Sequence, residues 1–261
     1  MIDFQNVSFS YGEESSGGGI RNVNLTINTG EFVLLTGESG CGKTTITRLV
    51  NGLVPHYYEG KLEGDVLLDG KSVSDTPLYD LAAMVGSVFQ NPKSQFFNVD
   101  TDSELAFACE NLGYPQEDIL KRIDRTVSDY HIEDLMGRSV FALSGGEKQK
   151  IACASSSVLL PGIMVLDEPS SNLDMAAIDD LRQVLSLWKK QGKTILIAEH
   201  RLYYLHDLAD RMLYVKDGEI EREYTPAEFD SLSDGTRKEM GLRPFSLSKL
   251  KPANQYQAVS Y

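Results

Sequence analysis

The chain has 261 residues, of which 41% are hydrophobic and 24% are charged, and its formal net charge at pH 7 is −13. This length and composition suit one large domain, or two small ones, with a buried core. The negative charge disfavours a protein that wraps nucleic acid or lies on an anionic membrane, because both partners are themselves negative, so no nucleic-acid partner is expected.

The N-terminal region has the pattern of antiparallel strands. Val23, Leu25 and Ile27 alternate with polar residues, and residues 2–9 show a looser version of the same period. Short, continuous apolar runs follow, as expected for strands that are buried on both faces of a parallel sheet. These runs are Phe32–Leu35, Val85–Phe89, Ile163–Leu166, Thr194–Ala198 and Met212–Val215. The sequence thus predicts an α/β fold with a mostly parallel sheet and an N-terminal antiparallel β layer.

A helical segment interrupts this series between the second and third runs. Ile119, Ile123 and Val127 recur every four residues, so they line one face of a helix within about residues 101–137. Beyond a tight turn at residues 217–218, the remaining chain is polar and carries no catalytic motif. The expected organisation is a core over residues 1–95 and 142–221, an inserted helical subdomain over 96–141, and a C-terminal tail or linker over 222–261.

A phosphate-binding loop follows the first of the buried runs. Residues 37–44 read G-E-S-G-C-G-K-T, in which glycines let successive backbone N–H groups point at phosphate oxygens and a helix N-terminus comes next. We expect Lys43 to reach the β- and γ-phosphates and Thr44 to hold Mg²⁺. The alternative, a glycine-rich turn that meets the pattern by chance, is disfavoured by the order of strand, turn and helix. The residues assigned to nucleotide binding here are Gly37, Glu38, Ser39, Gly40, Cys41, Gly42, Lys43, Thr44 and Thr45.

The sequence contains no signal for a membrane span. No apolar run reaches the about 18 residues that a membrane-crossing helix needs, and the first residues, M-I-D-F, do not resemble an export signal. We therefore expect a cytoplasmic chain that reaches a membrane only through partners.

Two further motifs decide which nucleotide-binding family the sequence resembles. Residues 143–149 read L-S-G-G-E-K-Q, and residues 163–169 read I-M-V-L-D-E-P. Alone, the Ser-Gly-Gly of the first motif could be a helix-capping turn. Between a phosphate loop and an apolar run that ends in Asp-Glu, it resembles the signature of the ATP-binding-cassette (ABC) ATPases. The resemblance covers residues 1 to about 221 and implies a P-loop NTPase fold with ATP and Mg²⁺ as ligands.

The resemblance assigns roles to residues at the ends of the buried runs. Asp167 holds Mg²⁺, usually through water, and Glu168 orients or deprotonates the attacking water. Gln90 links Mg²⁺ and that water to the helical insert, and His200 contacts the γ-phosphate. The alternatives are a solvated turn for the Asp-Glu pair, an ordinary turn residue for Gln90 and a surface or capped residue for His200.

Other assignments concern adenine and a second cassette. Tyr11 matches the aromatic residue that stacks on adenine, although a strand-end tyrosine is an equal alternative. Asp174 resembles a carboxylate that crosses a dimer interface, and its alternative is a helix N-cap. Ser144, Gly145 and Gly146 are expected to act on the ATP of a second ABC ATPase domain, in a homodimer, a heterodimer or a tandem fusion. ATP then closes the dimer and hydrolysis releases it.

Within the ABC ATPases, residues 89–97 and 143–149 look like the energy-coupling-factor importers of the cobalt and vitamin type. In those importers, two ATPase subunits drive a membrane scaffold and a substrate-binding membrane protein. The resemblance therefore implies a transmembrane transporter subunit as a partner of this chain. It also implies a peripheral location on the inner face of the cell membrane. Lys93-Ser94 departs from the acidic residue that is frequent there, so the substrate class stays open.

Two other functions remain as alternatives from the sequence. One is a soluble ABC ATPase of translation or DNA repair, which usually carries a second cassette with a basic linker or a long coiled coil. The other is a non-hydrolysing nucleotide-binding regulatory module, which the intact Glu168 and His200 disfavour. Residues 244–261 contain no acidic residue and look like an extended linker to a second cassette, or like an ordinary ragged C-terminus.

Overall fold

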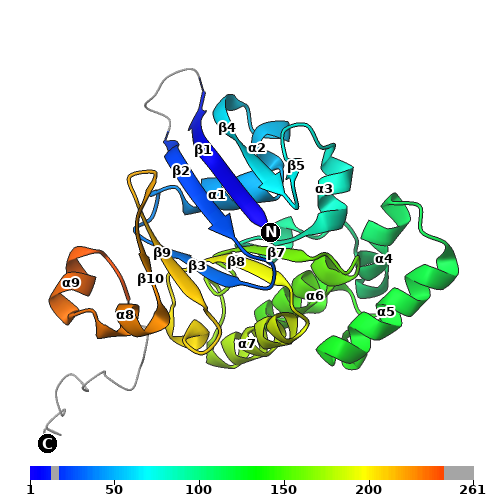
Figure 1. Ribbon diagram of the computed structural model, residues 1–261. Coiled ribbons are helices and arrows are strands. Elements are labelled where there is room, and N and C mark those ends of the chain that lie inside the picture. Colours follow the sequence, from blue (N-terminus) through cyan, green and yellow to red (C-terminus); the bar gives the residue numbers. More distant parts are fainter. Residues whose placement is uncertain (13–17, 244–261) are drawn as a thin grey trace, which may run out of the picture.

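The computed structural model describes residues 1–12 and 18–243. Within them, the chain forms a four-stranded antiparallel sheet and a six-stranded, mostly parallel sheet, with helices packed around both (Figure 1). The α/β fold with an N-terminal antiparallel layer is therefore confirmed.

The antiparallel sheet has the strand order β2-β1-β4-β5. Its strands are β1 (Ile2–Tyr11), β2 (Gly19–Ile27), β4 (Gly60–Leu68) and β5 (Lys71–Ser72). Ile2 pairs with Ile27 and Phe4 with Leu25, and all four side chains are buried. The apolar alternation of the sequence thus marks the buried face of this sheet.

The six-stranded sheet has the order β10-β9-β3-β8-β7-β6 and is parallel except for β10, which runs antiparallel to β9. Its strands are β3 (Phe32–Thr36), β6 (Val85–Val88), β7 (Ile163–Asp167), β8 (Thr194–Ala198), β9 (Arg211–Lys216) and β10 (Glu219–Tyr224). Strand β6 stops before Phe89, the end of the apolar run, because the Phe89 N–H bonds to Oε1 of Gln95 and leaves the ladder.

The core lies on both faces of this sheet. Phe32 and Leu34 of β3 face a cluster that includes helices α6 and α7, whereas Val33 and Leu35 face α1 and the antiparallel sheet. Burial on two faces explains why β3 is a continuous apolar run and not an alternating one.

Helices cover the sheets and form the insert. Those in the core are α1 (Lys43–Val50), α2 (Leu53–His56), α3 (Leu78–Met84), α6 (Gly145–Ser157) and α7 (Met175–Lys190). The predicted insert holds α4 (Thr101–Asn111) and α5 (Gln116–Tyr130), which lie to one side of the six-stranded sheet in Figure 1. Short 3-10 turns occur at Pro92–Ser94, Glu133–Leu135, Val140–Ala142 and Tyr203–Leu205.

Part of the predicted C-terminal tail packs on the core. Helices α8 (Pro226–Ser231) and α9 (Asp234–Glu239) follow β10, and Phe229 is completely buried against the cluster that covers α6 and α7. The predicted linker over residues 244–261 lies outside the described residues. Among the described helices, none has the length and apolar content that a membrane crossing requires.

Candidate functional site

The phosphate loop connects the end of β3 to the start of α1. Gly37 has φ 147°, and a Cβ atom built on it would lie 2.1 Å from the carbonyl oxygen of Val215. Gly42 has φ 113°, and its Cβ would lie 2.9 Å from Cγ2 of Ile20. Since only glycine adopts this backbone at such close approach, the sequence pattern reflects a steric requirement. Among the described residues, no side chain caps the N-terminus of α1, so its first N–H groups are available to phosphate oxygens.

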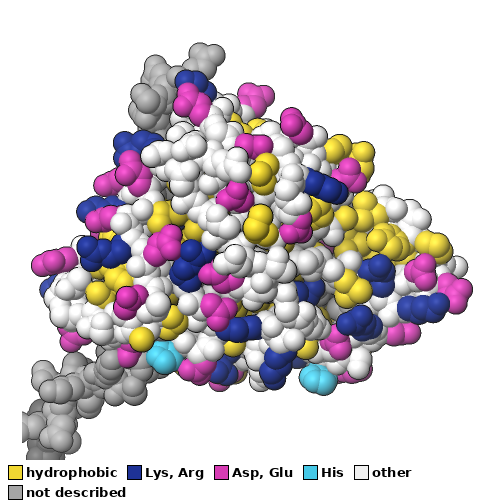
Figure 2. Space-filling model, in the orientation of Figure 1, with side chains coloured by type: hydrophobic (Ala, Val, Ile, Leu, Met, Phe, Trp, Pro, Cys, Tyr) yellow, Lys and Arg dark blue, Asp and Glu magenta, His cyan; other side chains and the backbone are white. Residues whose placement is uncertain are grey.

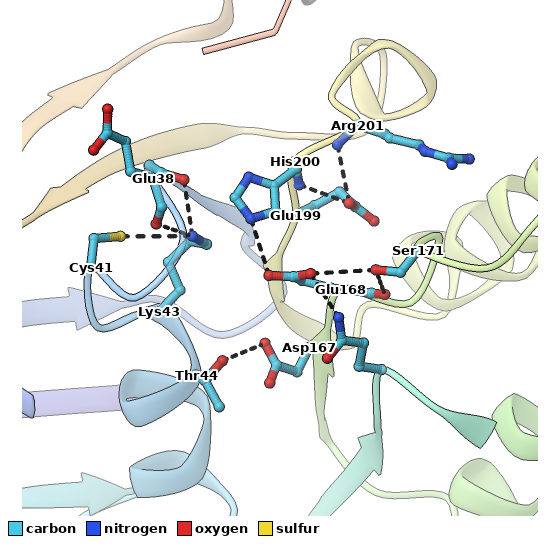
Figure 3. Close-up of polar contacts among 12 residues, drawn as sticks. Glu38, Cys41, Lys43, Thr44, Asp167, Glu168, Ser171, Glu199, His200 and Arg201 are labelled. Carbon is cyan, nitrogen blue, oxygen red and sulfur yellow. Dashed lines mark hydrogen bonds and ion pairs between the residues drawn. The ribbon is translucent and has the colours of Figure 1, made fainter. Parts of the chain in front are cut away.

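Lys43 is buried in this loop, with an exposed fraction of 3%. Its Nζ donates hydrogen bonds to the carbonyl oxygens of Gly37 at 2.9 Å and Glu38 at 2.8 Å, and it lies 3.7 Å from Sγ of Cys41 (Figure 3). All three are neutral groups. Among the described residues, no carboxylate lies within 4.0 Å of Nζ, so Nζ has no direct ion-pair partner and is placed to bind a phosphate anion.

Thr44 and Asp167 bring two oxygen ligands together opposite the loop. Oγ1 of Thr44 donates to Oδ1 of Asp167 at 3.1 Å. Burial raises the pKa of the Asp167 carboxyl, and the neighbouring charge of Glu168 adds to this, whereas the hydrogen bond from Thr44 opposes it. A hydroxyl beside a buried, poorly compensated carboxylate is the oxygen set that Mg²⁺ prefers, so these residues fit the ion. In the described chain, no group of three or more His, Cys, Asp or Glu residues is placed to hold a metal ion.

Glu168 lies where the ends of three strands meet. Its φ of 45° is left-handed, an uncommon conformation for a glutamate, and its N–H bonds to the carbonyl oxygen of Ala198 at 2.8 Å. Nε2 of Gln90 donates to Oε2 of Glu168 at 3.0 Å, and Oγ of Ser171 donates to the same atom at 3.3 Å. Oε1 lies 3.1 Å from Nε2 of His200 (Figure 3). The structure thus brings Gln90, Glu168 and His200 into one cluster.

Nε2 of His200 is buried and makes no hydrogen bond within the described residues. Its 3.1 Å contact with Glu168 is close enough for an ion pair, but it is not aligned as a hydrogen bond. A buried polar atom without a hydrogen bond normally has a ligand or water as its partner. The position of Nε2 therefore fits the phosphate group that the sequence assigns to this histidine.

Tyr11 lies beside α1 and not within the phosphate loop. Its ring packs edge-on against Phe9 and Tyr58, with ring centres 4.8 Å and 6.1 Å away. Its hydroxyl oxygen accepts a hydrogen bond from Nη1 of Arg48 and lies 3.3 Å from Oγ1 of Thr45. Adenine stacking by Tyr11 stays a prediction.

The signature residues and Asp174 both act as helix caps. Ser144 forms a capping box with Glu147 at the start of α6, and Ser144 and Gly145 are exposed. Oδ1 of Asp174 accepts a hydrogen bond from the Ala177 N–H at the start of α7. Capping does not conflict with the predicted contact to a second cassette, because these side chains lie at the surface.

Two polar residues next to the site were not singled out from the sequence. Ser171 follows the Asp-Glu pair and donates from Oγ to both the carbonyl and the carboxylate of Glu168. Glu199 precedes His200 and is buried, with its carboxylate bonded to surrounding N–H groups. An ionisable residue directly after a buried apolar run was the available signal for Glu199.

The raised pKa of Asp167 leads to a stability prediction. Above the raised pKa, the folded protein holds an unfavourable ionised carboxylate; below the ordinary value of 3.8 the group is protonated in both states and this cost is absent. Asp167→Asn removes the charge and keeps an oxygen for Thr44. At pH 7, without nucleotide or Mg²⁺, we expect its melting temperature to exceed that of the wild type by on the order of 2–4 °C, with the gain shrinking as the pH falls towards 3.8.

Asp207→Asn is the matched control for this measurement by differential scanning calorimetry. The Asp207 carboxyl is exposed, and its hydrogen bond with His206 lowers its pKa, so neutralising it should bring no gain in stability. An Asp167→Asn protein that melts at or below the wild-type temperature at pH 7 would contradict the prediction.

The sequence matches the protein family described as ABC transporter over residues 20–171. A relative from Treponema denticola is 46% identical over 251 residues, which are 96% of this chain and 51% of the relative. A relative from Pyrococcus abyssi is 40% identical, over 87% of this chain and 81% of the relative. Both carry the name ABC transporter ATP-binding protein. The chain spans about half the length of the first of these relatives.

Solved structures with the same fold agree with the family match. CbiO1 from Clostridium perfringens, described as part of the ABC transporter complex CbiONQ, superposes with a TM-score of 0.77 at 26% identity, covering 91% of this chain and 93% of CbiO1. The ATP-binding cassette MJ0796, described as a dimer in a post-hydrolysis state bound to ADP and Pi, gives a TM-score of 0.74 at 26% identity, covering 87% of this chain and 99% of MJ0796. With its phosphate loop, signature and Asp-Glu pair in these positions, the chain belongs to the ABC transporter family of ATP-binding cassettes.

Proposed function

We propose that this chain is an ATP-hydrolysing nucleotide-binding subunit or domain that powers a membrane transporter, of the energy-coupling-factor type that imports a vitamin or a metal ion. One observation supports the proposal that the chain hydrolyses ATP. The Glu168 carboxylate lies between Gln90 and His200, next to the Thr44–Asp167 pair (Figure 3).

Each residue of this cluster has a defined task in phosphoryl transfer, in which positioning and charge stabilisation carry most of the catalysis. Lys43 and the N-terminus of α1 bind the phosphates. Thr44 and Asp167 would hold Mg²⁺, which when bound neutralises phosphate charge. Glu168 orients the attacking water and accepts its proton, and Nε2 of His200 contacts the γ-phosphate.

A second cassette completes the site in this proposal, whether it is another copy of the chain, a different chain or a fused domain. Ser144 and Gly145 are exposed at the N-terminus of α6, where helix N–H groups favour an anion. The dimer described for MJ0796 supports this arrangement. Closing on ATP and opening after hydrolysis would supply the mechanical step, because a ligand shifts a conformational equilibrium by its differential affinity for the two states.

An apolar groove between the core and the insert is the proposed contact with a transmembrane subunit. It has a volume of about 390 Å³, and its lining includes Leu78, Tyr79, Phe97, Phe107 and Leu112. The rings of Phe97 and Phe107 stack with centres 4.8 Å apart, although 75% of Phe97 is exposed. Figure 2 shows hydrophobic side chains gathered on this side of the molecule. An exposed apolar patch of this kind marks an interaction site, and CbiO1 is described as part of a transporter complex.

Support for the importer type comes from the motifs at residues 89–97 and 143–149 and from the similarity to CbiO1. In this proposal the chain is cytoplasmic and peripheral on the inner face of the cell membrane. The transported substrate would bind the membrane partners, so the residues described above do not identify it.

Mg²⁺-dependent ATP hydrolysis tests the proposal. Turnover per chain should be low in dilute protein and rise with protein concentration, since each site needs a second signature motif. A phosphate-release assay over a hundredfold concentration range, together with light scattering, measures both the rate and the dimer. Constant turnover without a dimer would exclude the shared site, absence of hydrolysis would favour the regulatory module, and salt-sensitive retention on RNA or DNA would favour the translation or repair protein.

Two substitutions separate binding from hydrolysis. Glu168→Gln keeps the shape but loses the charge that orients water, so we expect unchanged ATP binding and a loss of turnover of about 10²-fold or more. Lys43→Ala removes a charge-assisted contact to phosphate and should weaken ATP binding by about tenfold to a hundredfold. Fluorescent-nucleotide titration and the phosphate-release assay check both, and equal ATP affinities for the two variants would refute the division of roles.

The groove is tested by placing a charge in it. Phe97→Asp should fold, because the side chain is largely exposed, but should reduce the fraction of the protein that sediments with membranes of its source cells by about tenfold. Leu120→Asp, on the exposed surface of α5 outside the groove, is the matched control and should sediment like the wild type. Equal membrane association of the wild type and Phe97→Asp would exclude the groove as the contact.

A further inference from the structure

Glu199 has a buried carboxylate at the end of β8, with an exposed fraction of 1%. Within the described residues this carboxylate accepts four hydrogen bonds. Oε1 accepts from the N–H groups of His200 at 2.7 Å and Arg201 at 3.1 Å. Oε2 accepts from the N–H of Ser170 at 3.2 Å and the hydroxyl of Tyr204 at 2.8 Å.

The two oxygens of Glu199 therefore hold two different segments. Oε1 fixes the backbone at His200, whose ring lies against Glu168. Oε2 fixes Ser170, the start of the segment 170–174, which leads from Glu168 to Asp174. All four donors are neutral, and no cationic side chain of the described residues lies within 4.0 Å of the carboxylate. Within this distance and within the described chain, the negative charge of the Glu199 carboxylate is stabilised by the four hydrogen-bond donors alone. These hydrogen bonds fix the positions of the donor groups closely.

Parallel contacts join the same two segments. Nη1 of Arg201 donates to the carbonyl oxygen of Leu173 at 2.9 Å, and the hydroxyl of Tyr203 donates to Sδ of Met175 at 3.1 Å. Hydrogen bonds across 28 or 29 positions of sequence thus tie residues 170–175 to residues 199–203. Glu199 is the buried member of this set, because the other contacts lie nearer the surface.

We propose that Glu199 is a positioning residue that sets the segment 170–174 and His200 in one geometry. The inference rests on the proposed function, since hydrolysis is the reaction it serves. Through Oε1 it places the His200 ring against Glu168, and through Oε2 it places the segment that carries Asp174 towards a second cassette. A change at the γ-phosphate of ATP, next to His200, is thereby coupled to the surface around Asp174 that faces a second cassette.

The chemistry requires a carboxylate and not an amide. Glutamine offers one acceptor oxygen, so its NH₂ group would face a pair of N–H or O–H donors that the second carboxylate oxygen now satisfies. Buried donors left without an acceptor would move one of the two segments. Displacements of about 1 Å at a phosphoryl-transfer site reduce turnover by up to about 10²-fold.

Glu199→Gln tests this through a split between kcat and KM. We expect kcat for ATP hydrolysis to fall about tenfold or more while the affinity for a non-hydrolysable ATP analogue stays within about twofold, because the hydrogen bonds of Lys43 and those of the Glu199 carboxylate have no partner in common. Glu31→Gln is the matched control: its carboxylate is also largely buried and accepts from a backbone N–H, that of Asn28, but it lies before β3, at the opposite end from the phosphate loop. A kcat for Glu199→Gln within twofold of the wild type, or no larger a change than for Glu31→Gln, overturns the proposal.

A second variant covers the case in which Glu199→Gln does not fold. Arg201→Met removes the bond to Leu173 from a partly exposed position, so it should fold and lower kcat about threefold at unchanged ATP affinity. A wild-type kcat in that folded variant would then count against the coupling of the two segments.

Amide hydrogen exchange separates failure of this inference from failure of the proposed function. If the wild type does not hydrolyse ATP, the proposed function fails, and exchange without nucleotide still decides the positioning role. In Glu199→Gln, the amides that lose their acceptor oxygen, either that of Ser170 or those of His200 and Arg201, should exchange at least tenfold faster than in the wild type, with β3 and α1 unchanged. Unchanged exchange at these three amides overturns the inference whether or not ATP is hydrolysed.

Discussion

Ala198 pairs with Leu35 on one side and with Asp167 on the other, in parallel register. Just beyond these pairs, the N–H of Glu199 donates a hydrogen bond to the carbonyl oxygen of Leu35. The N–H of Glu168 donates to the carbonyl oxygen of Ala198. Because these strands are parallel and in register, the chain leaves each of them at the same edge of the sheet. The phosphate loop, the Asp-Glu pair and His200 meet there for this reason, although they are far apart in the sequence.

Charges at this edge are held in an unfavourable state that a nucleotide would relieve. Lys43 is buried against neutral carbonyl oxygens, and the Asp167 pKa is raised chiefly by burial. No oppositely charged side chain of the described residues lies within 4.0 Å of either group, although Lys43 and Arg48 partly offset the effect of burial on the Asp167 pKa. A ligand that brings a phosphate group to Lys43 and a divalent cation to Asp167 would give both side chains a partner of opposite charge. This favours tight binding of the phosphate and the cation together.

The site is connected to distant surfaces by short segments. Residues 89–97 link Gln90, which contacts Glu168, to Phe97 in the apolar groove, and within this segment Nε2 of Gln95 donates to Ala152 and Ser156 of α6. On the opposite side, Glu199 joins His200 to the segment 170–174. Hydrogen bonds and the short segment 89–97 thus connect Glu168 to the groove and to α6.

The sequence by itself determined the fold class, the two N-terminal strands, the five strands that are continuous apolar runs, and the positions of the phosphate loop, the signature and the Asp-Glu pair. These are local signals: a run buried on two faces is continuously apolar, and a loop that wraps phosphate needs glycine. The resemblance to the ABC ATPases also pointed to Gln90, directly after an apolar run, and to His200, which Glu199 separates from the run Thr194–Ala198.

Only the tertiary structure decided which of these residues meet. The contacts of Glu168 with Gln90 and His200 depend on the neighbour order β8-β7-β6, which no local pattern encodes. The packing of Phe229 within the predicted tail, the left-handed backbone of Glu168 and the carboxylate of Glu199 between two segments likewise arise from long-range contacts. The physical reason is that a buried polar group takes its role from the donors around it, and those donors come from residues that only the folded sheet brings together.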